Sequence, residues 1–335
     1  MISEIMLFLG GIAVFSLGLR FIGENFGSAA GDRVSLSIKK TTENPFAAIL
    51  FGVGTTALAQ SSVAIDMAVV SLVDAGAVSF LSACAVVIGA NVGTTVTAQL
   101  VSFSFSAFSV TAIGSLVCFS GFLLSNFKGR RSRAAGDIMI GFGLIFIGIE
   151  IMTETINLFY DSKIFIALFS AKSLPIMLLN GIIVTAICQS SSVVSSILVI
   201  LAADGKVDFS GAVFFMLGAN IGSCFAVINA SKNKGIVSRR VALFNLIFNF
   251  FGAIIFAAAY CVSKDTFVKI FTGGANVSRA IANFHTFFNT ASALAAFPFL
   301  KPLCSLTVKL MPEKSKTGRL KRQNRAYSID NRALL

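Results

Sequence analysis

The triplet Gln60-Ser61-Ser62 lies inside an apolar stretch, and Gln189-Ser190-Ser191-Ser192 repeats it 129 residues later. Sliding the chain on itself by that offset aligns residues 52–97 with 181–226 without a gap, and sixteen of the 46 aligned positions are identical. The identical positions include glutamines, serines and asparagines, whereas a repeated packed core would preserve apolar residues. A duplication built around polar groups inside apolar sequence is typical of membrane carriers with a site at the midplane.

The composition is that of a membrane protein rather than a soluble domain. Of the 335 residues, 56% are hydrophobic and 13% are charged, and the mean hydropathy is +0.86, whereas about 25% of a globular protein is charged. The apolar runs are continuous and about 20 residues long, which suits spanning helices and not alternating strands. The first run has no basic leader and no cleavage site, so we expect a retained helix. We predict spans at 5–23, 80–100, 106–126, 137–157, 209–229, 241–262 and 280–300.

Residues 46–73 and 174–202 each carry the polar triplet between two apolar arms. One continuous helix over residues 46–73 would be about 42 Å long, well beyond the ~30 Å thickness of the hydrocarbon. Each segment is therefore either a bent spanning helix or a re-entrant hairpin with its polar tip inside the membrane. The distribution of Lys and Arg separates these alternatives.

Positive charge favours the hairpins. With two hairpins seven spans remain, and twenty Lys and Arg residues then fall on one side, predicted to be cytoplasmic, against six on the other. Full crossings would place the cluster from Lys128 to Arg133 outside. Three spans separate the hairpins, so the second copy is inverted. We therefore predict an all-α polytopic protein of the inner cell membrane with inverted repeats, which comprises a membrane domain at 1–300 (repeat one at about 5–126, repeat two at about 137–262, last span at 280–300) and a basic cytoplasmic tail at 301–335.

The hairpin tips carry groups that bind ions. A tip at membrane depth has unpaired backbone N–H groups, and its second arm presents a helix N-terminus, which attracts anions. Gln60 and Gln189 offer a carbonyl and an amide, and the serines offer hydroxyls that donate to an oxyanion or ligate a hard cation. Because the motifs contain no Lys or Arg, a bound anion would need co-bound cations. The alternative is that these small residues serve helix packing.

Further polar positions follow each tip. Asn91 and Asn220 each lie in a Gly-Ala-Asn-x-Gly motif, where glycine would permit a local break in a helix. The hydroxyls of Thr94, Thr95 and Ser223 extend this polar patch.

Asp66 breaks the duplication, because its partner position is Ser195. A carboxylate inside a membrane segment is a functional candidate by default. Asp66 would therefore reach a cation site or take up a proton, and the alternative is a carboxylate solvated in a wet vestibule. His285, the single histidine, is predicted to make a structural hydrogen bond rather than to set a pH dependence.

Several motifs resemble the type II sodium–phosphate cotransporter family over roughly residues 5–300. They are the paired Gln-Ser-Ser and Gly-Ala-Asn-Val/Ile-Gly motifs, the run from Arg239 to Asn249, and the run Phe284-His285-Thr286-Phe287-Phe288-Asn289. The resemblance implies sodium-driven symport of inorganic phosphate, with both tips forming the site. We accordingly assign phosphate binding to Gln60, Ser61, Ser62, Gln189, Ser190, Ser191 and Ser192. We assign sodium binding to Asn91, Thr94, Thr95, Asn220, Ser223 and Asp66.

The chain departs from the family pattern at three places. Val63 stands where a third serine is usual, Asp66 stands where a small or hydroxyl residue is usual, and Gly222-Ser223-Cys224 replaces a Gly-Thr-Thr. One cation ligand is thus lost and a carboxylate gained, which leaves the ion stoichiometry and the coupling ion open. We expect no PhoU-like helical domain, because a basic tail follows the last span.

We expect a secondary transporter and not an enzyme, because the sequence shows no nucleophile–base pair and no metal cluster. Its expected partners are phosphate, sodium as the coupling ion and the lipid bilayer, with no cofactor. The net charge of +12 lies in loops and the tail, which argues against nucleic acid. Homo-oligomerisation stays open. The alternatives are a cation-coupled carrier of another small oxyanion and a non-transporting membrane sensor on the same fold.

Overall fold

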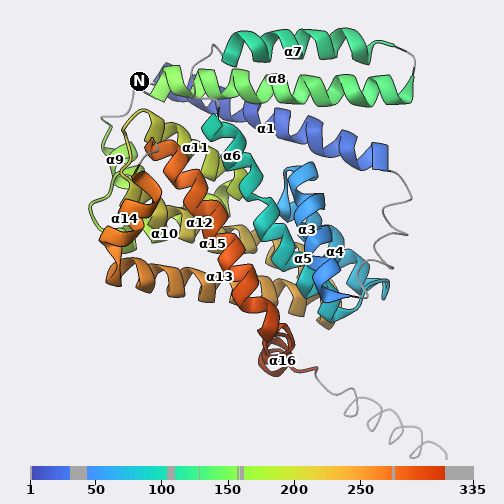
Figure 1. Ribbon diagram of the computed structural model, residues 1–335. Coiled ribbons are helices and arrows are strands. Elements are labelled where there is room, and N and C mark those ends of the chain that lie inside the picture. The colour runs from blue at the N-terminus through green and yellow to red at the C-terminus, as the bar shows by residue number, and fades with distance from the viewer. Residues whose placement is uncertain are drawn as a thin grey trace, which may run out of the picture.

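The computed structural model describes residues 2–30, 44–103, 110–127, 129–156, 158, 162–273 and 276–313. All regular structure in these ranges is helical, as predicted (Figure 1). In chain order the elements are α1 (Ile2–Ala30), α3 (Pro45–Ala59), α4 (Ser62–Asp74), α5 (Phe80–Gly93), α6 (Thr95–Phe103), α7 (Val110–Ser125), α8 (Arg130–Ile156), α9 (Lys163–Phe169), α10 (Leu174–Cys188), α11 (Ser191–Ala203), α12 (Phe209–Ser231), α13 (Ile236–Val262), α14 (Lys264–Thr272), α15 (Val277–Ala296), a 3-10 turn (Phe297–Phe299) and α16 (Leu300–Leu310).

Six helical passages in the described ranges are long and apolar enough to cross a membrane, and they correspond to six of the seven predicted spans. The seventh prediction, 106–126, corresponds to α7, which has 16 residues and is short for a crossing. Residues 106–109 of that prediction lie outside the described ranges. The last passage continues beyond residue 300, through the 3-10 turn into α16. The protein is therefore an all-α polytopic membrane protein.

The two Gln-Ser-Ser segments form breaks between paired helices, as the hairpin interpretation predicts. α3 and α10 both have 15 residues, α4 and α11 both have 13, and corresponding helices begin and end 129 residues apart. A 15-residue helix is about 22 Å long, too short to cross the hydrocarbon alone. The two arms of each hairpin contact each other. A continuous helix through either triplet is therefore excluded.

Duplicated glycines let each first arm pack closely against the helix that follows its hairpin. A Cβ on Gly52 or Gly89 would collide with a backbone carbonyl of the facing helix, so α3 and α5 touch backbone to backbone. Gly181 and Gly218 make the equivalent contacts between α10 and α12. Small residues of this kind allow close helix association inside membranes. Packing therefore accounts for the repeated glycines, but it does not account for the repeated glutamines and serines.

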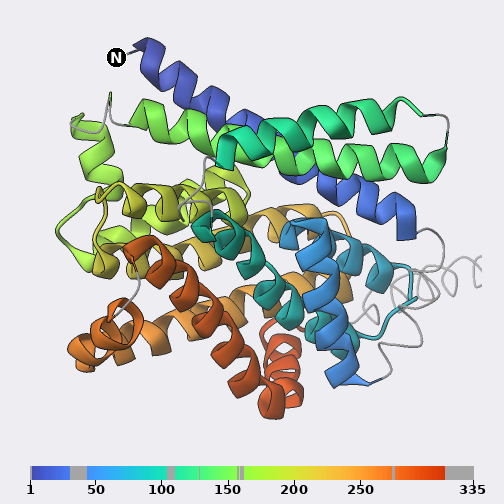
Figure 2. The same cartoon turned by 45° about the horizontal axis from the view of Figure 1, so that its top comes forward.

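The helices form two layers. α1, α7 and α8 pack together as one layer, which lies at the top of Figure 1 and comes forward in Figure 2. In the second layer the hairpin α3–α4 enters at one end of the long helices and α10–α11 enters at the opposite end (Figure 1). α13 packs against α12 and α4 in the way that α15 packs against α6 and α11. The core therefore consists of two inverted copies.

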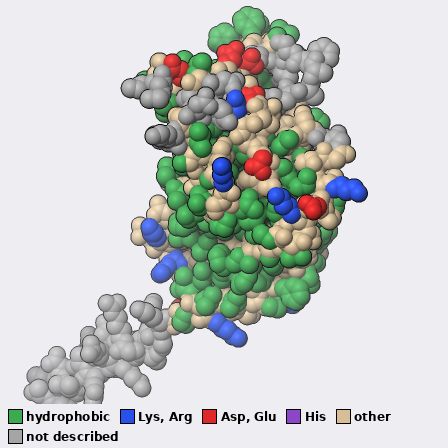
Figure 3. All heavy atoms as spheres, turned by 90° about the vertical axis from the view of Figure 1, so that its left-hand side faces the viewer, with side chains coloured by type: hydrophobic (Ala, Val, Ile, Leu, Met, Phe, Trp, Pro, Cys, Tyr) green, Lys and Arg blue, Asp and Glu red, His purple; other side chains and the backbone are tan. Residues whose placement is uncertain are grey.

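The two ends of the molecule differ in charge. The end that carries α9 and α14 shows Lys and Arg mixed with Asp and Glu (Figure 3). The opposite end, where α8 and α13 begin, carries the clusters Arg130, Arg131, Arg133, Lys232, Lys234, Arg239 and Arg240. The predicted inward charges at Arg33, Lys39, Lys40 and Lys128, and the tail from residue 314, lie outside the described ranges.

Thiol labelling in intact cells tests which end faces the cytoplasm. We expect a cysteine at Lys172, in a variant that lacks the six native cysteines, to react with an impermeant reagent. A cysteine at Arg131 should react only after permeabilisation, because basic clusters are retained inside. Both positions are exposed, so access through the protein does not limit either reaction. The reverse pattern would contradict the predicted orientation.

Candidate functional site

Both hairpin tips have the same strained backbone. Gln60 and Gln189 each have φ 53°, and they are the only residues other than glycine with positive φ in the described ranges. This left-handed conformation costs a residue with a Cβ roughly 1–2 kcal/mol. Each glutamine N–H closes the preceding helix by donating to the carbonyl of Thr56 or Thr185, at 2.8 and 2.7 Å. Strain that is repeated at two equivalent positions is typical of a functional site.

The serine after each glutamine begins the second arm. Ser61 Oγ accepts from the Ala64 N–H at 3.2 Å, and Ser190 Oγ accepts from the Val193 N–H at 3.4 Å, so both serines act as N-caps. Serine is favoured there because its oxygen satisfies an N–H that has no partner within the helix. The other N–H groups of these first turns also lack intrahelical partners. The two N-termini thus supply anion-binding N–H groups.

One cavity of about 610 Å³ brings both tips together. Gln60 and Ser61 line it from the first hairpin, and Cys188 and Ser190 line it from the second. Ser62, Ser191 and Ser192 are buried as the first residues of α4 and α11. Two segments 129 residues apart in the chain therefore meet at a common space.

The two glutamines differ in their surroundings. Gln60 is buried, and its carbonyl Oε1 accepts from Thr97 Oγ1 at 2.8 Å while its amide donates to the Ala57 carbonyl. Gln189 is exposed, and within the described residues its side chain makes no hydrogen bond. The residue equivalent to Thr97 is Ala226, which has no hydroxyl to offer. The side-chain amide of the first tip is thus held in place, whereas that of the second is not held by the described residues. Gln189 does not line the cavity, although its neighbours Cys188 and Ser190 do.

Helix α1 adds charge to the cavity that the tip motifs lack. Ser16, Arg20 and Glu24 line the cavity from this helix. The tip motifs themselves contain no Lys or Arg, as the sequence shows, but the cavity wall includes Arg20 from the predicted first span. Sequence reasoning did not place this arginine beside the tips.

Asp66 lies in a second, buried polar cluster. It is only 3% exposed, so it does not point into a wet vestibule. Its Oδ2 accepts from Asn245 Nδ2 at 3.1 Å, and Asn245 Oδ1 accepts from Asn249 Nδ2 at 2.8 Å and from Asn91 Nδ2 at 3.3 Å. Asp66 Oδ1 and Asn249 Oδ1 are buried without a hydrogen-bond partner among the described residues. Oxygen atoms of this kind are the ligands that hard cations prefer.

The second copy has a related cluster without a carboxylate. Asn220 Nδ2 donates to Asn289 Oδ1 at 2.8 Å, and Asn289 Nδ2 donates to the His285 carbonyl at 3.0 Å. Ser195 Oγ donates to the Ser192 carbonyl at 3.0 Å. Both ring nitrogens of His285 are buried, and neither has a hydrogen-bond partner in the part of the chain that the structure describes, so the predicted structural hydrogen bond is wrong for the ring.

The hydroxyls predicted to extend these clusters donate to backbone carbonyls three or four residues earlier in the chain. Thr94 Oγ1 donates to the Ala90 carbonyl at 2.9 Å, Thr95 Oγ1 to Val92 at 2.8 Å, and Ser223 Oγ to Asn220 at 2.7 Å. The predicted helix break occurs only in the first copy, where α5 ends at Gly93. α12 runs unbroken through Gly222.

Sequence reasoning missed the three asparagines that complete these clusters, Asn245, Asn249 and Asn289. A signal was present: Phe244-Asn245-x-x-Phe248-Asn249 recurs forty residues later as Phe284-His285-x-x-Phe288-Asn289. Polar residues at i and i+4 lie on one face of a helix, and inside an apolar helix such a face needs polar partners.

Several relatives of this chain carry a name that describes phosphate export. The chain is 28% identical over 313 residues to "Putative inorganic phosphate export protein YjbB" of Escherichia coli (strain K12), a match that covers 91% of this chain and 56% of that protein. The same figures hold for the protein of Escherichia coli O157:H7. The chain thus spans a little over half the length of the YjbB proteins.

A second relative is similar over nearly its whole length. "Uncharacterized protein YqeW" of Bacillus subtilis (strain 168) is 27% identical over 318 residues, which cover 90% of this chain and 97% of that protein. No solved structure matches the chain. The family model described as Na+/Pi-cotransporter matches residues 14–154 and 162–284, which include both hairpins and both polar clusters except His285 and Asn289. The chain therefore belongs to the Na+/Pi-cotransporter family, a family of membrane transporters and not of enzymes.

Proposed function

We propose that the protein is a sodium-coupled carrier of inorganic phosphate that works by alternating access. The cavity shared by the two hairpin tips is the observation that carries this proposal, because it combines two helix N-termini, two capping serines and an arginine in one space. Family membership supports phosphate as the substrate. In this proposal residues 1–300 form the transport unit in the inner membrane, with the basic tail in the cytoplasm.

Phosphate would bind between the tips. The capping serines of α4 and α11 line this space, and the N–H groups at a helix N-terminus favour an anion. The exposed Gln189 side chain, which lies between the lining residues Cys188 and Ser190, would turn toward this space to donate to a phosphate oxygen. The hydroxyls of Ser61 and Ser190 have lone pairs and a rotatable proton that suit either protonation state of phosphate. Ser62, Ser191 and Ser192 support this binding from the first turns of α4 and α11.

Sodium would bind at the cluster of Asp66, Asn245 and Asn249. Asp66 Oδ1 and Asn249 Oδ1 are buried without a partner and supply hard oxygen ligands. A buried carboxylate is costly in a membrane, and a bound cation removes that cost by neutralising it. Asn91 would support the sodium site indirectly, because its amide donates to Asn245 Oδ1. Thr94 and Thr95 lie three and four residues after Asn91 in the chain, and their hydroxyl oxygens would add to the site. Asn220 and Ser223 would form the weaker counterpart in the second copy.

The inverted hairpins supply the means of alternating access. Two inverted copies can exchange conformations, so a site between them opens first to one side and then to the other. A carrier of this kind runs in the direction set by its ion and substrate gradients. An inward sodium gradient of normal size would therefore drive uptake, and a high internal phosphate concentration would drive the export that the names of the relatives describe.

Reconstitution into proteoliposomes tests the coupling. We expect labelled phosphate to accumulate in the presence of an inward sodium gradient, and arsenate to compete because it has the same tetrahedral shape. Choline in place of sodium, at a matched membrane potential, should reduce uptake to the level of protein-free vesicles. Equal uptake in choline would refute sodium coupling, and sulfate uptake without phosphate uptake would favour the carrier of another oxyanion. Binding without transport would favour the sensor.

A further inference from the structure

Helix α1 passes directly beside the first hairpin tip. A Cβ on Gly23 would collide with the Ala59 carbonyl, the residue just before Gln60. This close approach fixes the position of α1 along its own axis relative to the tip. Arg20 lies almost one turn before Gly23 and Glu24 lies directly after it, and both side chains line the cavity that holds Gln60, Ser61 and Ser190.

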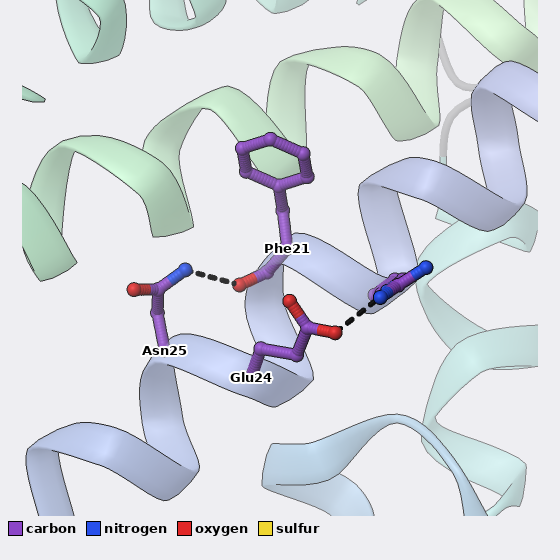
Figure 4. Close-up of polar contacts among 4 residues, drawn as sticks. Phe21, Glu24 and Asn25 are labelled. Carbon is purple, nitrogen blue, oxygen red and sulfur yellow. Dashed lines mark hydrogen bonds and ion pairs between the residues drawn. The ribbon is translucent and has the colours of Figure 1, made fainter.

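Arg20 and Glu24 form an ion pair on the cavity wall. Arg20 Nε lies 2.6 Å from Glu24 Oε1, and the two side chains are 70% and 62% exposed. Figure 4 shows Glu24 pointing at the guanidinium along the helix, whereas Asn25 turns back to donate to the Phe21 carbonyl at 3.0 Å. Among the residues that line the cavity, these two are the charged ones.

We infer that Arg20 is the side chain that contacts phosphate in this cavity, and that Glu24 holds the guanidinium when phosphate is absent. This inference rests on the proposed function. The tips supply neutral donors, so among the described residues that line the cavity no other cationic side chain would stand against a bound phosphate. Guanidinium presents a planar fork of N–H donors that matches two oxygens of phosphate as well as it matches a carboxylate.

Because both side chains of the pair are exposed, replacing Glu24 by phosphate at the guanidinium costs little free energy. When phosphate takes the guanidinium, the carboxylate of Glu24 is released into water rather than buried without a partner. Glu24 thus competes with phosphate for Arg20, and it disfavours anions that do not present two oxygens to the fork. α1, which lies outside the duplicated hairpins, then adds a cationic contact and selectivity to the phosphate contacts that the tips make.

An ordinary helix-stabilising pair is the alternative reading. Exposed ion pairs at i and i+4 contribute roughly 0.3–0.5 kcal/mol to a helix. Such a pair is broken equally by Arg20→Gln and by Glu24→Gln, so both variants would then have the same small effect. The inference instead predicts opposite effects on phosphate affinity, because one variant removes the phosphate contact and the other removes its competitor.

The test measures phosphate KM in proteoliposomes at saturating sodium, together with equilibrium phosphate binding to the purified protein. We expect Arg20→Gln to raise KM and Kd by about tenfold, the effect of losing a charge-assisted contact. Arg20→Lys should recover part of this loss, and Glu24→Gln should lower KM and Kd. Sodium activation should stay unchanged in all three variants, and Arg131→Gln, at an exposed position on α8, should match the parent.

The outcomes separate this role from the carrier function. If the parent transports phosphate and Arg20→Gln keeps the parental KM and Kd, Arg20 does not contact phosphate and the carrier function stands. Equal changes in Arg20→Gln and Glu24→Gln would likewise overturn the role of Arg20. A parent that neither binds nor transports phosphate would overturn the proposed function, and this role with it.

Discussion

Gln189→Ala should reduce phosphate transport at least about tenfold while leaving the stability of the protein unchanged. The Gln189 side chain is exposed and makes no hydrogen bond within the described residues, so its removal leaves no buried hydrogen-bond partner unsatisfied. A hydrogen bond to a charged ligand is worth about 1.5–3 kcal/mol, which corresponds to roughly a tenfold to hundredfold change. Initial rates of phosphate uptake in proteoliposomes measure transport, and the melting temperature of the protein in detergent measures its stability. Ser191→Ala, at the first residue of α11, should also reduce transport strongly.

The equivalent change at the first tip should behave differently. Gln60→Ala removes the acceptor of Thr97 Oγ1, which is buried. The orphaned hydroxyl should destabilise the protein by about 1 kcal/mol or more, so that melting falls together with transport. Thr55→Ala and Ser196→Ala are matched controls, because each hydroxyl donates only within its own helix. Parental transport by Gln189→Ala and Ser191→Ala at unchanged expression would favour packing as the role of the triplets.

Asp66→Asn should raise the sodium concentration needed for half-maximal transport by about tenfold or more. The change keeps an oxygen beside Asn245 Nδ2 but removes the charge that holds a cation against Asp66 Oδ1 and Asn249 Oδ1. In the parent, protons should compete with sodium for the carboxylate, so that sodium activation shifts with pH. The variant should lose that shift, because an amide does not titrate in this range. Uptake measured over sodium concentration at several pH values gives both quantities.

Asp74 provides the matched control for this variant. It lies on the same helix, where Oδ1 accepts from the Gly235 N–H at 2.7 Å and from Ser238 Oγ at 3.2 Å. Asp74→Asn should therefore keep the parental sodium curve and lose some stability at the contact between α4 and α13. If Asp66→Asn also kept the parental sodium curve and pH profile, the cation site would consist of amides, hydroxyls and backbone alone.

The hairpins could be predicted from the sequence because their causes are local. A glutamine that ends one helix and a serine that caps the next are adjacent in the chain, and the same motif occurs twice. The cluster around Asp66 could not be predicted in full, because Asn245 lies 179 residues away from it. Nothing in a single sequence pairs two polar residues at that separation.

Two other parts of the site escaped prediction for different physical reasons. Arg20 and Glu24 read as an ordinary pair along one helix, and only the contact of Gly23 with Ala59 brings them to the tip. The continuous course of α12 could not be foreseen from its motif, because Gly93 and Gly222 make the same close contact with the first arm of their hairpin. α5 nevertheless ends at Gly93, whereas α12 continues through Gly222.

The backbone contacts of Gly52 and Gly89 with the facing helix, and those of Gly181 and Gly218, have a mechanical consequence. Helices that touch at their main chains have no side chains between them to slide or re-pack, so neither hairpin can slip along its neighbour. We therefore expect α3 to move with α5 as one rigid unit, and α10 to move with α12 as another. A movement that opens the cavity would then occur between these two units or between them and α1, which also lines the cavity.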